Sequence, residues 1–328
     1  MTERPLLTQI SDDIYQLRLP LPFALNHVNV YLLNAPSGWT IVDCGINWDK
    51  GRQVWQYAFD ELRFSGADIE QIVLTHVHPD HFGLAGWLYQ LAQSAGRDIQ
   101  IKTSQREIEQ AQAVWGNERI EFKYWLSDNG MPPDMADDVD HSMGDTYKMT
   151  LPHAPHLTAL DLNQPIKLGE RLFKPIFAPG HSDGQILFYD DSEKLLLSGD
   201  HVLMKITPNI GLWENTDSNP LGAFMASLRD LSSLDVDIAL PGHRNIIEDW
   251  SGRISELLLH HEQRLDLVIA KVSKGHWTPY QIANHLFDTG RFTTHEWRFA
   301  IAETLAHLDY LRVEGKIKQA DDEQVFSV

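Results

Sequence analysis

The densest group of ionisable side chains lies in the segment Thr75-His76-Val77-His78-Pro79-Asp80-His81. Neutral imidazole and carboxylate are ligands that suit zinc, iron or manganese. Four ionisable groups within six positions destabilise one another in a solvated turn unless a ligand binds them. We therefore predict that His76, His78, Asp80 and His81 bind metal.

Three later segments bring further candidate ligands to the ends of apolar strands. They are Pro179-Gly180-His181, Ser198-Gly199-Asp200 and Pro241-Gly242-His243. A glycine directly before a ligand lets the backbone turn tightly into a crowded site. Asp43 is a further acid at a strand end, and we expect it to orient a metal ligand rather than to bind metal itself. The recurrence of this pattern predicts one shared site.

The elements that must position these residues alternate between strand and helix over the first 250 residues, which predicts a layered α/β domain. Runs of β-branched and apolar residues predict strands over 14–21, 28–34, 39–45, 71–76, 99–104, 157–163, 171–180, 184–190, 194–200 and 237–243. Helical patterns cover about 49–65, 83–96, 104–115 and 220–234. Because the candidate ligands follow strands, we expect them to meet at the sheet edges where α/β proteins place ligands.

Two regions depart from this alternation. Residues 116–156 are rich in Met, aromatic and acidic residues and contain Pro132-Pro133, which predicts an irregular helical insertion near the pocket. Further on, helical patterns over 254–275, 278–287 and 298–315 precede a candidate hairpin. Three helices followed by a hairpin are typical of a winged-helix domain. We therefore expect a catalytic domain over 1–250 and a small winged-helix-like domain over 251–328.

The chain has 328 residues, with 27 Lys+Arg against 46 Asp+Glu and a formal charge of −19. That acidity argues against broad affinity for nucleic acid or anionic membranes. Residues 251–328 hold nine basic and eleven acidic side chains, which does not indicate a phosphate-binding face. The single cysteine, Cys44, excludes an intrachain disulfide and a Cys-rich zinc site. No apolar run is long enough to span a bilayer and the first residues lack a secretory pattern, so we expect a cytoplasmic protein.

In this order, Asp43, the cluster at 76–81, His181, Asp200 and His243 resemble the five motifs of the metallo-β-lactamase superfamily of metal-dependent hydrolases. The resemblance covers about residues 10–250 and implies an αβ/βα four-layer sandwich. It also implies a site for two divalent metal ions, with zinc as the first expectation and iron or manganese as alternatives. One metal would be held by His76, His78 and His181, and the other by Asp80, His81 and His243, with Asp200 bridging both.

The same resemblance implies a mechanism of hydrolysis. Two cations would share a water and lower its pKa, so that a metal-bound hydroxide attacks a small ester, thioester or lactone. Asp80 would act in catalysis by orienting the nucleophile or relaying a proton. Glyoxalase II, the hydroxyacylglutathione hydrolase, is the nearest well-known enzyme by motif. The C-terminal region, however, resembles the winged-helix domain of the lactamase-β-like branch, which argues against glutathione as part of the substrate.

Two alternatives stay open. Members of the lactamase-β-like branch include ribonuclease-like enzymes, so a single-strand nuclease is the second hypothesis, and a nucleic-acid-binding regulator is the third. For the pocket wall we expect side chains from inserted loops, namely Phe23, Tyr124, Trp125, Ile210 and Trp213. A mostly apolar wall suits a small, partly hydrophobic substrate. The C-terminal domain would pack on the catalytic body, border the pocket or mediate a homodimer.

Overall fold

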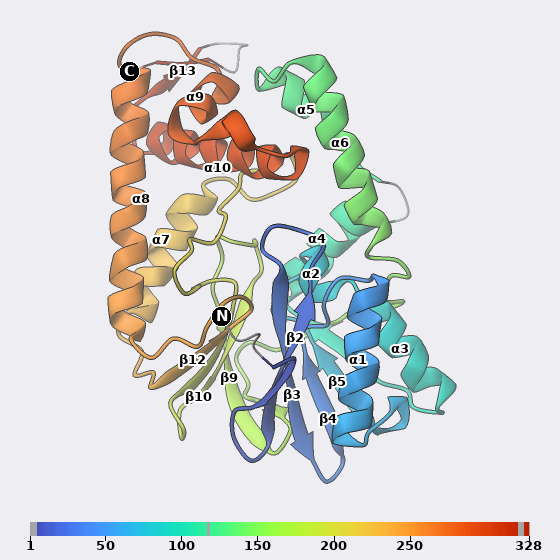
Figure 1. The fold of residues 1–328 in the computed structure, drawn as a ribbon. Coiled ribbons are helices and arrows are strands. Elements are labelled where there is room, and N and C mark those ends of the chain that lie inside the picture. The colour runs from blue at the N-terminus through green and yellow to red at the C-terminus, as the bar shows by residue number, and fades with distance from the viewer. Residues whose placement is uncertain (1–4, 117–118, 321–324, 328) are drawn as a thin grey trace.

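The computed structural model describes residues 5–116, 119–320 and 325–327. Two β-sheets pack face to face and carry helices on their outer sides (Figure 1). The larger sheet has the strand order β1-β2-β3-β4-β5-β6-β7, and the smaller has the order β12-β11-β10-β9-β8. This arrangement confirms the predicted αβ/βα sandwich.

The larger sheet is antiparallel at one end and parallel at the other. Its strands are β1 (Leu7–Gln9), β2 (Ile14–Pro20), β3 (His27–Ala35), β4 (Gly38–Val42), β5 (Ile69–Val73), β6 (Gln100–Thr103) and β7 (Thr158–Ala159). Strands β1 to β4 pair antiparallel, and β4 to β7 pair parallel. The strand predicted over 157–163 is thus reduced to two residues.

The smaller sheet carries three of the candidate ligand loops. Its strands are β8 (Ile166–Leu168), β9 (Arg171–Phe177), β10 (Ile186–Asp190), β11 (Leu195–Gly199) and β12 (Ile238–Pro241). Strands β8 to β11 pair antiparallel, and β11 and β12 pair parallel. The sequence did not predict β1 and β8, because three residues are too few to show a strand alternation.

Helices cover the outer face of each sheet. They are α1 (Asp49–Leu62), α2 (Pro79–Phe82), α3 (Ala85–Ser94) and α4 (Gln105–Trp115) on the side of the larger sheet, and α7 (Pro220–Leu231) and α8 (Trp250–Val272) on the side of the smaller sheet. Two short 3-10 helices are also present, η1 (Gly66–Asp68) before β5 and η2 (Thr289–Arg291) in the C-terminal region. One core lies between the sheets, where Leu33 and Val73 of the larger sheet meet Phe188 and Leu197 of the smaller one.

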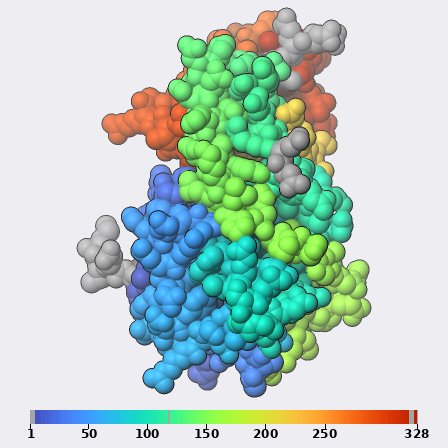
Figure 2. All heavy atoms as spheres, turned by 90° about the vertical axis from the view of Figure 1, so that its right-hand side faces the viewer, coloured from blue at the N-terminus to red at the C-terminus, as the bar shows by residue number. Residues whose placement is uncertain are grey.

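The insertion forms two helices, α5 (Lys123–Asp128) and α6 (Pro133–Lys148). Their apolar side chains pack against α10 (Thr294–Val313) of the C-terminal region, where Leu126 and Val139 share a buried cluster with Ile301. Figure 2 shows the insertion, in green, running along one side of the molecule between the N-terminal sheet region and the C-terminal helices. The insertion therefore connects the catalytic body with the C-terminal region.

The C-terminal region contains α8, α9 (Pro279–Leu286), α10 and a small antiparallel pair, β13 (Lys318–Gln319) with β14 (Phe326–Ser327). Reciprocal side-chain caps begin two of the helices, from Thr278 with Gln281 and from Thr293 with Glu296. The elements follow the predicted order of three helices and a strand pair, while the winged-helix assignment stays a prediction. In the described part of the chain, no helix is long and apolar enough to cross a membrane.

Candidate metal centre

The candidate ligands lie in loops that follow the carboxyl ends of strands. The segment from His76 to His81 follows β5 and leads into α2. Asp200 directly follows β11, His243 lies two residues after β12, and His181 lies in the loop after β9. Because the two sheets face each other, these loops come together at one edge of the sandwich.

The structure brings all seven predicted ligands into one cluster. Potential ligand atoms lie within 4.8 Å of one another in three overlapping groups, which are His76, His78 and His181; His76, His81 and Asp200; and Asp80, His81 and His243. Asp200 lies between them: its Oδ2 is 3.0 Å from Nε2 of His243 and 3.7 Å from Nε2 of His181. Its Oδ1 lies 3.4 Å from Nε2 of His81. This central position is the one that the bridging role requires.

Backbone carbonyls fix the orientation of two imidazoles. Nδ1 of His181 lies 2.8 Å from the carbonyl oxygen of Asn209, and Nδ1 of His243 lies 2.7 Å from that of His27. A ring nitrogen that faces a carbonyl oxygen carries a proton, so Nε2 is the nitrogen that each ring directs to the centre.

Asp43 orients two further imidazoles without facing the centre itself. Its carboxylate accepts hydrogen bonds from N and Oγ1 of Thr75, each at 2.8 Å, and from Nδ1 of His81 at 2.8 Å. The Thr75 hydroxyl in turn lies 2.9 Å from Nδ1 of His76. The arrangement is that of the orienting residue expected from the sequence.

The residues of this cluster fit divalent cations. Nε2 of His76, Nε2 of His81 and Oδ1 of Asp200 are buried without a hydrogen-bond partner among the described residues. Buried polar atoms of a folded protein are almost always satisfied, so three orphaned acceptors converging on one point indicate a missing cationic partner. Burial and the neighbouring His81 lower the pKa of His76 well below its usual value. Burial and His181 lower the pKa of His78 to about 3, so both rings are neutral and ready to ligate.

Glu107 on α4 joins the two principal ligand loops. Its fully buried carboxylate accepts hydrogen bonds from the backbone N of Val77 at 2.7 Å, from that of Gly184 at 2.8 Å, and from the hydroxyl of Ser182. We did not identify Glu107 from the sequence, because a glutamate in the first turn of a helix is usually exposed to solvent.

A second connection reaches the metal centre from the C-terminal region. The Nδ2 group of Asn209 donates to Oε2 of Glu303 on α10 at 3.1 Å and to the carbonyl oxygen of Phe299 at 3.3 Å. The carbonyl oxygen of Asn209 is the one that holds His181. Helix α10 therefore supports a metal ligand through one intervening residue, which no local sequence pattern indicated.

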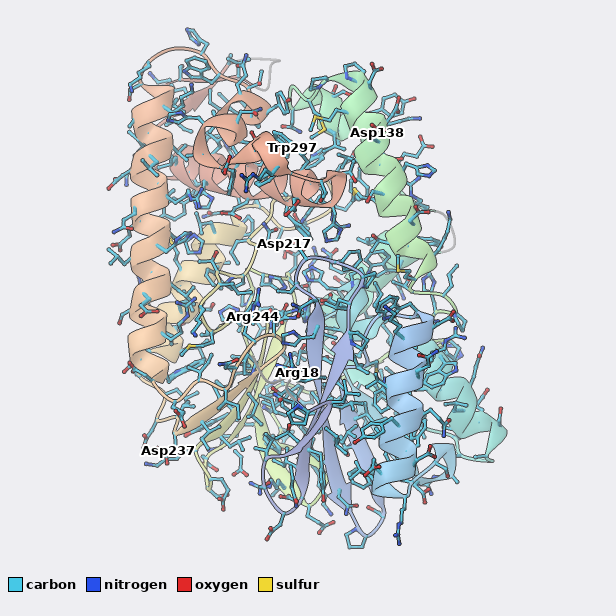
Figure 3. All side chains as sticks on the ribbon, viewed as in Figure 1. Arg18, Asp138, Asp217, Asp237, Arg244 and Trp297 are labelled. Atoms are coloured by element: carbon cyan, nitrogen blue, oxygen red, sulfur yellow. The ribbon has the colours of Figure 1, made fainter. Side chains whose placement is uncertain are left out.

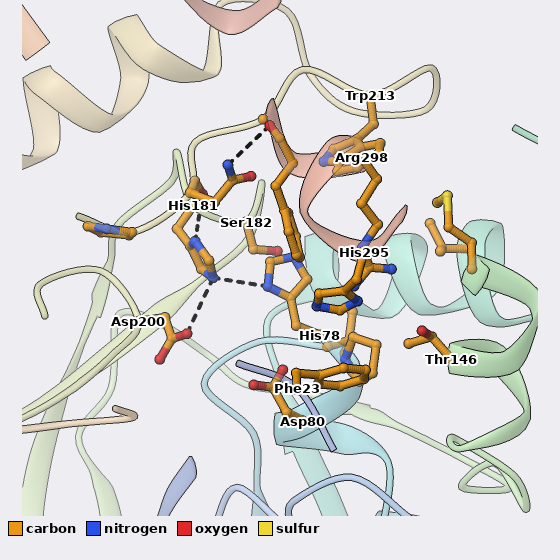
Figure 4. A pocket seen from close by; sticks show the side chains of 18 of the residues that line it. Phe23, His78, Asp80, Thr146, His181, Ser182, Asp200, Trp213, His295 and Arg298 are labelled. Carbon is orange, nitrogen blue, oxygen red and sulfur yellow. Dashed lines mark hydrogen bonds and ion pairs between the residues drawn. The ribbon is translucent and has the colours of Figure 1, made fainter. Parts of the chain in front are cut away.

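A cavity of about 410 Å³ opens beside the cluster. His78, Asp80, His181, Asp200 and His243 lie on its inner side. Mostly apolar side chains form its walls, and they come from the β2–β3 loop, α4, the insertion, the 203–216 segment and α10. Figure 4 shows Trp213, Arg298 and His295 on one side of this space, His181 and Asp200 on the other, and Phe23 beneath His78.

Of the five residues expected in the pocket wall, two line this cavity. Phe23 and Trp213 line the cavity. Tyr124 does not, because it is 67% exposed on the outer side of α5. Trp125 also lies outside the cavity and stacks on Trp213 at 5.5 Å between ring centroids. Ile210 is fully buried in the core beside α7 and α8.

Three further buried histidines and the cysteine have their side-chain contacts outside the ligand cluster. His201 is buried against Ser227, and His261 pairs with His307 between α8 and α10. Cys44 is a buried free thiol in the core of the larger sheet. Burial, followed by Asp43, raises its pKa well above the usual value, so it stays a neutral thiol.

Comparisons with known proteins agree with this architecture. Residues 265–327 match the model described as "Metallo-beta-lactamase-like, C-terminal domain". The chain is 27% identical over 316 residues to the "Probable metallo-hydrolase YqjP" of Bacillus subtilis, covering 94% of each protein. It is 26% identical over 279 residues to the "Lactamase-like protein vrtG" of Penicillium aethiopicum, covering 82% of this chain and 69% of that protein.

Two solved structures resemble nearly the whole chain. A metallo-beta-lactamase family protein from Thermus thermophilus has 30% sequence identity and a TM-score of 0.86, with 97% of this chain and 99% of that chain covered. A beta-lactamase domain protein from Burkholderia ambifaria has 26% identity and a TM-score of 0.88, with 98% and 94% covered. The model of the "Metallo-beta-lactamase superfamily" itself matches residues 24–95 and 108–243, which hold every candidate ligand. The chain therefore belongs to the metallo-beta-lactamase superfamily.

Proposed function

We propose that this chain is a hydrolase of small ester, thioester or lactone substrates that uses two divalent cations, zinc first and iron or manganese as alternatives. The observation that carries the proposal is the set of buried acceptors without a hydrogen-bond partner among the described residues on His76, His81 and Asp200, the last of which lines a largely apolar cavity. When bound there, such cations would lower the pKa of a water molecule and polarise a substrate carbonyl. His76, His78 and His181 would hold one cation, Asp80, His81 and His243 the other, and Asp200 both.

Asp80 has the position expected of a residue that handles a proton. Its side chain lines the cavity, and Oδ2 lies 3.2 Å from Nε2 of His243. Although burial raises the pKa of Asp80, the neighbouring His81 and His243 lower it further than burial raises it. The carboxylate is therefore ionised at neutral pH, where it can orient an attacking water and accept its proton.

The walls of the cavity would bind the non-reacting part of the substrate. Phe23, Trp115 and Trp213 expose apolar surface to the space, and Phe23 stacks on His295 at 4.1 Å. Burial of hydrocarbon gives about 25 cal/mol per Å², so a short acyl chain would gain several kcal/mol here.

The decisive experiment combines metal analysis with a substrate panel. Purified protein is loaded with Zn, Mn or Fe, analysed for metal content, and assayed on aryl esters, thioesters, lactones and single-stranded RNA. We expect hydrolysis of at least one ester-type class. Metal-loaded protein that is inactive on every ester-type substrate would overturn the proposal, and cleavage of RNA alone would support the nuclease hypothesis instead.

Asp200→Ala provides the matched test of the site. The change removes the shared ligand, so it should abolish turnover and lower metal content while most of the fold stays intact. Asp237→Ala is the control, because Asp237 is an exposed acid far from the cavity (Figure 3). Full activity with full metal content in Asp200→Ala would refute the assignment.

A further inference from the structure

Arg298 is a cation inside the cavity without an acidic partner. Its side chain extends from α10 into the space above the metal centre and lies beside His295 (Figure 4). Among the described residues no carboxylate lies within 4.0 Å of its guanidinium, and its buried Nε has no hydrogen-bond partner. The ring of the adjacent Phe299 lies 4.5 Å from the guanidinium carbon. A partly buried guanidinium without an acidic partner is costly, which indicates that a group outside the chain completes it.

Other arginines nearby are paired. Arg119 also lines the cavity, and its Nη2 lies 2.6 Å from Oδ2 of Asp140. Arg312, on the same helix as Arg298, lies 2.6 Å from Asp309. Arg298 differs in this from Arg119 and Arg312, whereas Nε of Arg244, which does not line the cavity, is also buried without a hydrogen-bond partner in the described part of the chain.

The acids that face the cavity are already engaged. Among the described lining residues these are Asp80 and Asp200, each within 3.2 Å of His243, Asp183, which is 2.7 Å from Arg106, and Glu296, which accepts hydrogen bonds from Thr293. Asp80 is the one carboxylate that acts on Arg298 at longer range. Because Asp80 is also a proposed cation ligand, its charge would be neutralised in the loaded protein.

His295 offers a second polar atom next to Arg298. It lies one helical turn before Arg298, and its Nδ1 is buried without a hydrogen-bond partner among the described residues. Burial, followed by the charge of Arg298, lowers the pKa of His295 to about 3, so the ring is neutral at physiological pH. A neutral imidazole can donate one hydrogen bond to an anion.

We propose that Arg298, assisted by His295, binds a carboxylate on the substrate, so that the substrate is a small ester or thioester with one free carboxylate on a hydrocarbon chain. The planar guanidinium matches a carboxylate in two parallel hydrogen bonds. Arg298 is one unpaired guanidinium in a largely apolar part of the cavity wall, which suits a single negative charge and not a polyphosphate. This inference rests on the proposed function for its ester or thioester class, and on Arg298 alone for its charge.

Binding of compounds that cannot be hydrolysed as esters tests the charge preference independently of turnover. Calorimetry on zinc-loaded protein compares the N-methyl monoamide of adipic acid with N-methylhexanamide, which carries a methyl group where the first has a carboxylate. We expect the acid to bind about 10–100-fold more tightly, the effect of a charge-assisted hydrogen bond. A phosphonate analogue that binds more tightly than the carboxylate would overturn the carboxylate assignment.

Three variants decide whether Arg298 is responsible. Arg298→Met should remove the preference for the acid, and Arg298→Lys should keep part of it. Arg312→Met makes the same charge change on the same helix outside the cavity and should leave the ratio unchanged. Persistence of the full preference in a folded Arg298→Met protein would overturn the proposal, because the carboxylate would then bind elsewhere, such as at the cations.

A kinetic comparison separates this inference from the proposed function. Thioesters of adipic and hexanoic acid should differ in KM by a similar 10–100-fold, and Arg298→Met should remove that difference with little change in kcat. If neither thioester is hydrolysed but the amide preference depends on Arg298, the thioesterase function fails and the anion site stands. Equal KM and equal Kd for the charged and neutral compounds would overturn the anion site.

Discussion

Replacing Arg298 by methionine should stabilise the protein while it weakens the binding of anions. The guanidinium is partly buried and has no acidic partner within 4.0 Å among the described residues, so its removal breaks no ion pair. Methionine has a similar length and an unbranched stem, so it can keep most of the aliphatic contacts in the cavity wall.

The size of the effect follows from the cost of the buried charge. Burial lowers the pKa of Arg298 from its usual 12.5 to about 10. A folded-state pKa below the unfolded value means that, at any pH below about 10, the charged form costs the folded state more than the unfolded one. A fall of that size corresponds to about 3 kcal/mol at most. Since part of the side chain reaches the cavity, we expect the free energy of unfolding of Arg298→Met to exceed that of the native protein by about 1–3 kcal/mol. This corresponds to an increase of roughly 2–6 °C in Tm.

Urea and thermal unfolding at pH 7.5, in the absence of ligand, measure this difference. The control is Arg312→Met, where the half-exposed guanidinium is lost and the buried carboxylate of Asp309 loses its ion-pair partner, at a cost of about 1–3 kcal/mol. The two variants should therefore shift the unfolding midpoint in opposite directions. A loss of more than about 1 kcal/mol in Arg298→Met would refute the reasoning, because it would mean that the guanidinium already has a stabilising partner.

Three further changes test the positioning of the centre. Asp43→Asn should weaken metal binding about 10–100-fold, because an amide cannot accept every hydrogen bond from Thr75 and His81. A metal affinity equal to that of the native protein in a titration would contradict this. Burial raises the pKa of Glu107 from 4.5 to about 7. The protonated carboxyl therefore stabilises the folded state below pH 4.5. This contribution to the free energy of unfolding, up to about 3 kcal/mol, is lost as the pH rises from 4.5 to 7. Glu107→Gln should lack this pH dependence of stability. If the urea midpoints of the native protein and the variant change equally between pH 5 and 7.5, the prediction is wrong. Gly180→Ala should cost about 2–4 kcal/mol, because its φ is +136° and a Cβ would lie 2.4 Å from that of Phe224, and an unchanged midpoint would count against this.

The ligand cluster could be predicted from the sequence because each of its residues lies within a local sequence pattern at the end of a strand. His76 follows an apolar strand, and His181, Asp200 and His243 each follow a glycine where such a strand stops. A strand end fixes the sheet edge at which a side chain lies, so spacing along the chain translates directly into proximity.

The residues that support the cluster could not be predicted in this way. Glu107 is identified by its three hydrogen bonds to loops at 77 and 182–184, which depend on long-range packing. Tyr124 and Trp125 belong to a helix whose apolar face could meet the body, the pocket or another helix, and periodicity does not say which. The exposed position of Tyr124 and the stacking of Trp125 behind Trp213 follow from the insertion packing on α10.

Helix α10 contributes two residues to the site, Glu303 and Arg298, at different positions along its length and around its axis. Glu303 holds Asn209, which holds His181, so a change at Glu303 would reach the metal centre through two hydrogen bonds. Arg298 lies more than one turn earlier and touches none of that connection. Substitutions at Arg298 can therefore alter which substrates bind while the metal ligands keep their places. If the N-terminal body supplies the metal ligands and the C-terminal helix the substrate-binding charge, as proposed, substrate choice would vary separately from metal binding.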